Sequence, residues 1–438
     1  GFLSSFVRAC YAGDGPSTRL VKAAHLPTDS DDGEQHGGHR LCSMEGLLDE
    51  SIRCFGAFRT ACGLYLDKIA LDDDGAAGDC SLSASGFGLV VLCVGVERGL
   101  HTLEYALRAA AETVAAAARV GTSANGFMLH WCDQAGRGDG EFSTIDTALF
   151  VLGALLSAKY FAARGPAGEP AACGYEAQVH SLASRVRWAE ALLEDSDGAP
   201  GLYLKMSADG RGEGVTRLFN EYFLLATCGA NAEALAGAPG AATSFFVRHL
   251  ALPPAGAARS YWGHALLTDS SARFLSSFIV QYCHYLSAHF ASSEAYSRHF
   301  AAAAAADQLW WSKAAPAAAA SGAWGCGPGA YPQNVPRDLF GYKACALDDN
   351  AALVYSAPIV AGFLPAVPEA AKLLLRWRAS GDACCCRVRG ETALWRASLR
   401  HPEWRAPTIE AVDYAPMVLG CAAHVLGPAF FRDYAASP

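Results

Sequence analysis

Three acidic residues far apart in the chain stand beside apolar segments, where a carboxyl group could act as an acid or a base. Glu221 lies in "TRLFNEYFLLATCG", and its neighbours at helical spacing are Leu218 and Leu225. A carboxyl group on such an apolar stripe would be desolvated, which favours the protonated form that a general acid requires. The alternative is a glutamate that pairs with a base such as Arg217 or points to water. The pattern leaves both interpretations open.

Asp413 lies in "PTIEAVDYAPMVLG", close to the start of the last long apolar segment. Pro416 suits the first turn of a helix, so Asp413 is expected just before that helix N-terminus. The helix dipole would help to keep the carboxylate ionised, as a general base requires. Spacing alone favours the simpler alternative, in which Asp413 satisfies backbone donors in a turn.

Asp146 follows Ser143 by three residues, ahead of the apolar run "TALFVLGALL". This is a capping-box arrangement, and the helix dipole favours a carboxylate in the first turn. These residues alone therefore favour a helix start, and a role in chemistry is the alternative.

Aromatic residues in the expected loops could stack on sugars or pack in the core, and their positions do not decide between the two. They include Trp131, Trp324, Tyr331 and Trp404. Motifs for other chemistries are missing. The sequence has no G-x-S-x-G and no H-E-x-x-H, and the Gly-rich "GAWGCGPGAYP" lacks the Lys and Ser/Thr of a phosphate loop.

The elements that must position these residues are mostly helices. From Met44 onward apolar residues recur at helical spacing, for example at about 144–163, 216–228 and 416–432, and long loops separate the helices. Alternating patterns are scarce, and only short ones such as "GLYLKM" suggest a hairpin. About ten to twelve helices without a solenoid repeat favour a closed α/α toroid over an open array.

Composition limits the possible partners. The chain has 438 residues, of which 52% are hydrophobic and 18% charged, so a large core is available. The net charge is −9 and the basic residues are scattered, which argues against nucleic acid as a partner. The longest apolar runs, such as "FGLVVLCVGV", are too short to cross a bilayer, so no membrane partner is expected. The sixteen cysteines leave the compartment open.

Six motifs occur in an order that resembles a known family. They are "SASGFGLVVLCVGVERG", "NGFMLHWCD", "STIDTALFVLGALLSAKYF", "FNEYFLL", "IVQYCHYL" and "VDYAPMVL". In this order they resemble the bacterial glycoamylase-like domain, a group that includes inverting endo-β-1,2-glucanases and the transglycosylase domain of cyclic β-1,2-glucan synthases. The resemblance runs from about Met44 to about Tyr434.

The resemblance implies a single (α/α)6 toroid with the substrate in a cleft at one end of the ring. Glu221 matches the glutamate of the family's "YNE" motif, which looks like the general acid. Asp413 matches the aspartate of "DQGP", which looks like the general base. Asp146 matches the aspartate of "STxDTA", which lines the cleft. A cap at a helix start can therefore also be a cleft carboxylate.

The resemblance further implies a set of substrate-binding residues: His130, Trp131, Tyr222, Gln281, His284 and Phe340. The sequence also departs from the family. "DQGP" is "DYAP" here, and the family's "WGLTA" loop corresponds only loosely to "LFGYKACAL" at 339–347.

The function expected from the resemblance is inverting hydrolysis of β-1,2-glucan by general acid/base catalysis, which needs no metal or cofactor. We expect residues 44–438 to form the hydrolase domain and residues 1–43 to be an N-terminal arm. One alternative is a transglycosylase of the same fold. The other is a non-catalytic glycan-binding or structural relative.

Overall fold

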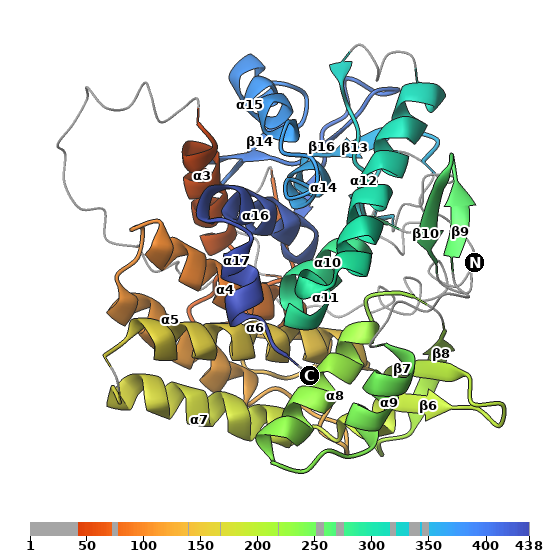
Figure 1. The fold of residues 1–438 in the computed structure, drawn as a ribbon. Coiled ribbons are helices and arrows are strands. Elements are labelled where there is room, and N and C mark those ends of the chain that lie inside the picture. Colours follow the sequence, from red (N-terminus) through yellow and green to blue (C-terminus); the bar gives the residue numbers. More distant parts are fainter. Residues whose placement is uncertain are drawn as a thin grey trace.

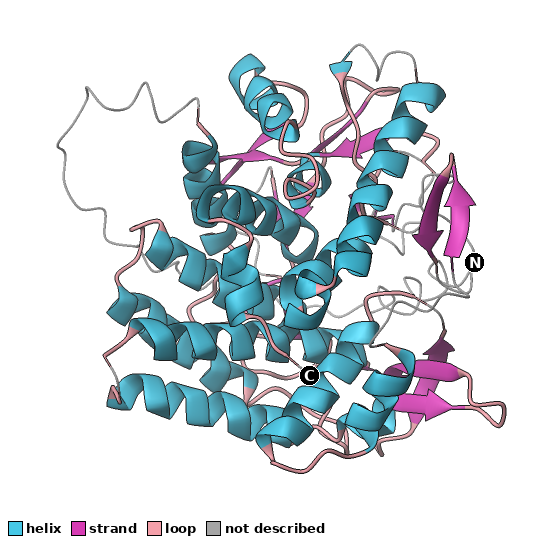
Figure 2. Ribbon diagram, in the orientation of Figure 1, coloured by secondary structure: helices cyan, strands magenta, loops and turns pink. Residues whose placement is uncertain are grey.

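The computed structural model describes residues 43–71, 78–138, 140–166, 168–217, 219–250, 258–268, 276–315, 321–332, 342–343 and 350–437. The expected arm at 1–43 lies outside them apart from Ser43, as do Leu218 and Phe340. Helices dominate the described part of the chain, and the strands are short, with two to seven residues each (Figures 1 and 2).

Six helices form an inner ring. They are α4 (Leu82–Glu97), α6 (Thr144–Arg164), α8 (Phe223–Leu235), α10 (Phe278–Leu286), α14 (Ala357–Gly362) and α16 (Ala411–Leu426). Each contacts the next in this order, and α16 contacts α4, which closes the ring. The expectation of a closed α/α toroid is therefore confirmed.

Six further helices pack outside this ring, one beside each inner helix. They are α3 (Met44–Gly56), α5 (Leu103–Ala117), α7 (Pro170–Ser184), α9 (Ala241–His249), α12 (Glu294–Ala314) and α15 (Ala370–Ser380). α3 contacts both α16 and α4 and so covers the place where the ring closes. Within the described residues there are also the short helices α11 (Ala288–Ser292) and α17 (Ala429–Tyr434) and a 3-10 turn (Trp188–Ala191).

Inner helices α4 and α6 are apolar on nearly all sides, because each packs against several neighbours. They approach closely at two glycines: a Cβ on Gly86 would lie 2.5 Å from the Leu149 carbonyl oxygen. A Cβ on Gly153 would lie 2.1 Å from the Gly86 oxygen. By length and composition α6 could cross a membrane, contrary to our expectation, yet 89% of its apolar window is buried in this fold. The apolar surface of α6 therefore serves the core.

The strands form small antiparallel ladders. Those near the N-terminal ends of α4, α6 and α16 are β1 (Tyr65–Leu66), β2 (Lys68–Ala70), β3 (Cys80–Ser81), β4 (Trp131–Cys132), β5 (Phe142–Ser143) and β17 (Thr408–Glu410). The expected "GLYLKM" hairpin is β7 (Pro200–Met206) with β8 (Gly212–Thr216), joined by β6 (Leu192–Glu194) and β5. Two further hairpins follow helices in the chain: β9 (Ala258–Tyr261) with β10 (His264–Leu267), and β14 (Cys385–Val388) with β15 (Glu391–Leu394). Two more pairs join segments that are farther apart: β11 (Gly329–Ala330) with β12 (Tyr342–Lys343), and β13 (Val354–Ser356) with β16 (Arg396–Ser398).

These ladders join the segments that precede the inner helices. β17, directly before α16, pairs with β2, and β3, directly before α4, pairs with β1 and β4. Before α8 and α10, the Phe219 amide donates to the Thr268 carbonyl at 3.2 Å, and the Ser277 amide donates to the Cys326 carbonyl at 3.0 Å. The N-terminal ends of the inner helices therefore meet at one end of the ring.

Candidate active site

Asp146 both caps a helix and faces a histidine. Its amide donates to the Ser143 hydroxyl at 3.2 Å, as the capping box predicts, and that hydroxyl donates to Asp146 Oδ2 at 2.5 Å. The same Oδ2 lies 3.4 Å from His130 Nε2. Only 6% of Asp146 is exposed. The helix-start interpretation of Asp146 is therefore confirmed, and its role as a cleft carboxylate stays a prediction.

His130 links Asp146 to a second carboxylate, Glu141, whose Oε1 lies 3.4 Å from His130 Nδ1. Burial lowers the pKa of His130, but the negative charges of Asp146 and Glu141 outweigh burial, and the net shift is upward. Lys205 Nζ lies 3.7 Å from Glu141. The His130 ring also stacks on Trp131, with centroids 3.4 Å apart. His130 therefore lies beside Asp146 and Trp131 beside His130, and their expected role in substrate binding stays a prediction.

Glu221 lies in a turn before α8 and not within a helix, which corrects the expected pattern at 216–228. Asn220 shapes this turn: its Oδ1 accepts from the Tyr222 amide at 2.9 Å, and its side-chain amide donates to Thr216 Oγ1 at 2.5 Å. Glu221 therefore does not lie on the helix that carries Leu225, and Leu218 lies outside the described residues. Glu221 is half-buried at the N-terminal end of an inner helix.

Asp413 is the third residue of α16, which begins at Ala411, so it lies within the helix and not before it. Pro416 is consequently inside the helix. Burial raises the pKa of Asp413 well above its usual range, and the charge of Glu410 raises it further. The expectation that the helix dipole dominates at Asp413 is not met, because burial and the neighbouring acids shift its pKa upward.

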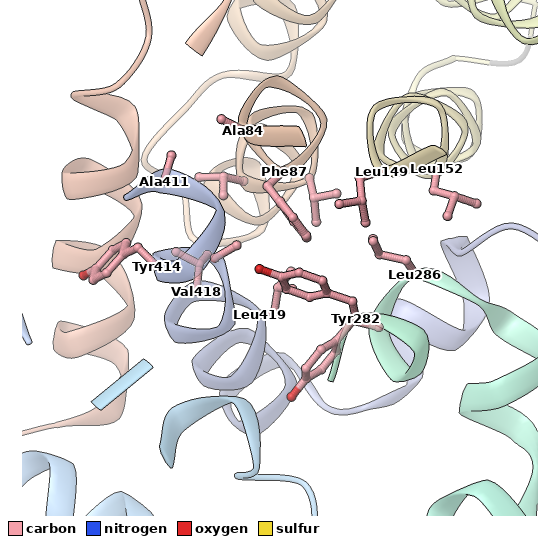
Figure 3. Packing of buried hydrophobic residues seen from close by; sticks show 14 of the residues in the cluster. Ala84, Phe87, Leu149, Leu152, Tyr282, Leu286, Ala411, Tyr414, Val418 and Leu419 are labelled. Atoms are coloured by element: carbon pink, nitrogen blue, oxygen red, sulfur yellow. The ribbon is translucent and has the colours of Figure 1, made fainter. Parts of the chain in front are cut away.

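The three carboxylates all lie within electrostatic reach of one phenol, Tyr282 of α10. Burial raises the pKa of Tyr282 well above its usual range, and the negative charges of Asp413, Glu221 and Asp146 each add to this effect. The Tyr282 hydroxyl donates to the carbonyl of Val412, the residue before Asp413. Figure 3 shows Tyr282 among core side chains of the inner helices, and its ring centroid lies 4.8 Å from that of Phe87. Asp146, Glu221 and Asp413 therefore come together, although 267 positions separate the first from the last.

Three buried ionisable residues near this group were not found from the sequence: Asp67, Arg396 and Glu410. Asp67, between β1 and β2, accepts a hydrogen bond from Trp131, and burial raises its pKa. Burial also raises the pKa of Glu410, the last residue of β17, to about 7. The available signal was an acidic residue in a short and mostly apolar segment, as in "LYLDKIA".

Two predicted substrate-binding residues lie between helices. Gln281 is 0% exposed, and its side-chain amide donates to the Ile359 carbonyl at 2.9 Å, so it joins α10 to α14. His284 stacks on Phe300 of α12 with centroids 4.4 Å apart, and burial lowers its pKa to about 4. These contacts place both side chains between helices, and their expected role in substrate binding stays a prediction. Tyr222 is buried beside Glu221, and Phe340 lies outside the described residues.

The loop aromatics differ in burial. Trp324 is buried and stacks near Phe363, and Tyr331 is buried beneath Lys343. Trp131 is partly exposed next to Asp67 and His130. Among the residues that the structure describes, no group of His, Cys, Asp and Glu side chains has a metal-binding arrangement, and the cysteines are free thiols.

This arrangement suits acid/base chemistry on a bond that reaches between two inner helices. Glu221, on the turn before α8, is accessible enough to give a proton to a bound group. Asp413, on α16, has a raised pKa and can take a proton once it is ionised. The two residues belong to different elements of the ring, an arrangement that allows them to approach one bond from opposite sides.

No protein-family model matches the chain, and no curated protein matches its sequence. Solved structures, in contrast, do match the fold of this chain. A proposed glucoamylase from Bacteroides caccae superposes with a TM-score of 0.71 and 17% identity, covering 90% of this chain and 96% of that one. The endo-β-1,2-glucanase from Chitinophaga pinensis, bound to sophorotriose and glucose, gives a TM-score of 0.68 and 16% identity, covering 90% of this chain and 95% of that one.

A third match is the endo-β-1,2-glucanase from Talaromyces funiculosus in complex with sophorose. Its TM-score is 0.56 at 11% identity, covering 90% of this chain and 88% of that one. At these identities the likeness shows a shared fold. The resemblance to the glycoamylase-like group with its endo-β-1,2-glucanases is thus confirmed at the level of the whole ring.

Proposed function

We propose that this protein is an inverting glycoside hydrolase that cleaves β-1,2-glucan, with its active site in the ring at 44–438. The observation that carries the proposal is the convergence of Asp146, Glu221 and Asp413 around Tyr282. An inverting glycosidase needs two carboxyl groups on different sides of the substrate, one as general acid and one as general base. The substrate class is taken from the solved relatives, two of which are endo-β-1,2-glucanases with bound sophorose or sophorotriose.

In this mechanism Glu221 donates a proton to the leaving glycosidic oxygen as the bond from that oxygen to the anomeric carbon breaks. A water molecule attacks the anomeric carbon from the other face of the sugar, and Asp413 accepts its proton. Asp146, fixed by Ser143 and His130, would hold sugar hydroxyl groups near the bond. Trp131 offers a partly exposed ring for sugar stacking.

The test is incubation of the purified protein with β-1,2-glucan, followed by sizing of the products and NMR of their anomeric protons. Inverting hydrolysis would give shorter glucans whose new reducing ends are first α-anomers. Parallel incubations with β-1,3- and β-1,4-glucans test the linkage. Longer or cyclic products would indicate transfer instead. An unchanged β-1,2-glucan would contradict the proposal.

A further inference from the structure

Asp413 does not stand alone at the start of α16. Glu410 is the N-cap residue of this helix and Asp413 its third residue, a spacing that places both side chains on one face. Arg396, on β16, is 2% exposed and acts electrostatically on both acids, each of which is 4% exposed. Two carboxyl groups and one guanidinium are therefore enclosed together.

Several polar atoms of this cluster have no hydrogen-bond partner within the described part of the chain. They are Glu410 Oε2, Asp413 Oδ2, and Arg396 Nε and Nη1, and all four are buried. Gly329 lies against both Arg396 and Glu410: a Cβ there would be 2.0 Å from Arg396 Nη1 and 3.1 Å from Glu410 Oε2. Buried polar atoms are rarely left unpaired. Their shared position indicates a polar site that is completed by a proton, a water molecule or a substrate hydroxyl.

The other bonds of the cluster fix its members in place. Arg396 Nη2 donates to the Gly327 carbonyl at 2.9 Å. Thr408 Oγ1 donates to Glu410 Oε1 at 2.5 Å, and Tyr342 donates to Asp413.

The other ionisable groups nearby do not balance the two acids. Asp67, on the segment between β1 and β2, adds a third buried carboxyl group that acts on both Glu410 and Asp413. Lys68 lies opposite Glu410 in the β2–β17 ladder but is only partly buried, and Tyr282 faces Asp413 from α10. Ionising both acids beside one guanidinium would leave an uncompensated buried charge, which is costly.

We propose that Glu410 is a positioning residue for Asp413: the two carboxyl groups share one proton, and Arg396 compensates the single negative charge that remains. The inference rests on the proposed function, because it assigns Asp413 as the base. When the proton is on Glu410, Asp413 is ionised and can accept a proton from water. Each turnover then places a second proton on the pair, which passes to solvent. Two carboxyl groups that interact in this way titrate as a unit.

The first test compares the pH dependence of β-1,2-glucan hydrolysis in the wild type and Glu410→Gln. The substitution removes the charge that raises the pKa of Asp413. The acidic limb of the pH–rate profile should therefore move down by on the order of one pH unit. KM should change little, because Glu410 acts through Asp413. Glu369→Gln removes a charge at an exposed helix start and is the matched control, with no expected shift. An acidic limb that stays in place in Glu410→Gln would overturn the inference.

The second test needs no activity, so it separates this inference from the proposed function. Burial raises the pKa of both acids, so the folded state holds more protons than the unfolded state between about pH 4 and pH 7. Their contribution to stability is therefore greatest below the unfolded pKa values and falls as the pH rises. Glu410→Gln should show a shallower fall in Tm over this range than Glu369→Gln. Equal slopes would contradict the shared proton, even if no β-glucan is cleaved.

A milder variant covers the case in which Glu410→Gln does not fold. Thr408→Val keeps the shape but removes the donor to Glu410, so Glu410 holds its proton to higher pH. Asp413 then faces less negative charge, and the acidic limb should move down by less than in Glu410→Gln. A move to higher pH would overturn the inference.

Discussion

Glu221 gains its accessibility from the turn that holds it. Because it precedes α8, its carboxyl group lies at the end of the ring and not on a buried helix face. As the proposed acid, it supplies a proton that an amide cannot. We predict that Glu221→Gln hydrolyses β-1,2-glucan on the order of a hundredfold more slowly, or worse, because general acid catalysis is lost.

The same variant should still bind β-1,2-glucan in calorimetry, since its shape is kept. Glu213→Gln, on the half-exposed strand β8, is the control and should keep wild-type turnover. Near-normal turnover by Glu221→Gln would remove this residue from the mechanism.

Asp413 should determine the acidic limb of the pH–rate profile. Burial, followed by the charge of Glu410, raises its pKa, and the base works only when it is ionised. We therefore predict that kcat/KM rises with pH through a limb well above the ordinary aspartate range, which is about pH 4. A pH–rate profile on β-1,2-glucan measures it, and Asp413→Asn should lose most of the rate at every pH. A limb at about pH 4 would show that Asp413 is not buried with Glu410 in solution.

At this scale the sequence predicted the residue types better than their surroundings. Asp146, Glu221 and Asp413 were recognised through motifs, and the structure brings them together. Gln281 and His284 share a motif, but one joins α10 to α14 and the other stacks between α10 and α12. A motif records which residues occur together and does not say which face of the helix each one occupies.

Among the elements, α16 shows how a helix tolerates an internal proline. Pro416 has no N–H, so the Val412 carbonyl, four residues earlier, lacks its helical donor. The Tyr282 hydroxyl donates to that carbonyl instead and so ties α10 to α16. We predict that Tyr282→Phe costs about 1–3 kcal/mol of unfolding free energy, because a buried carbonyl loses its partner.

A double-mutant cycle with Pro416→Ala tests this explanation by urea unfolding. The alanine would supply the N–H that the Val412 carbonyl lacks, so Tyr282→Phe should cost less in that background than in the wild type. Equal costs in both backgrounds would show that the phenol stabilises the protein by some other contact.

The sequence located the helices well but not all of their ends. The helix expected at about 144–163 is α6, because Ser143 provides a clear cap. The helix expected from 416 begins five residues earlier, at Ala411, since Pro416 was taken as a start signal. The pattern at 216–228 merged β8, a turn and the beginning of α8, because apolar residues continue through all three. Periodicity shows that a helix exists, and tertiary contacts determine where it begins.

For the whole molecule, closure is the property that the sequence could not demonstrate. Helical hairpins of similar length suit an open solenoid as well as a ring. The decisive contacts join the chain's last inner helix, α16, to α3 and α4 near its described start. They depend on close approach at glycines, as at Gly420, where a Cβ would lie 1.8 Å from the Ala361 oxygen of α14. One sequence does not reveal which glycines serve such contacts.

A closed ring should unfold as one unit, since each inner helix depends on two neighbours. Gly86→Ala forces a methyl group into the Leu149 carbonyl between α4 and α6, and overpacking of this kind costs about 1–3 kcal/mol or more. Gly420→Ala should do the same between α14 and α16. Gly174→Ala, on exposed α7 with no atom within 4 Å of the new Cβ, should instead gain about 0.5–1 kcal/mol. In urea titrations followed by far-UV and near-UV circular dichroism, both core variants should shift a single transition that coincides for the two probes. A second transition that one variant moves and the other leaves in place would show an open, divisible array and not a closed ring.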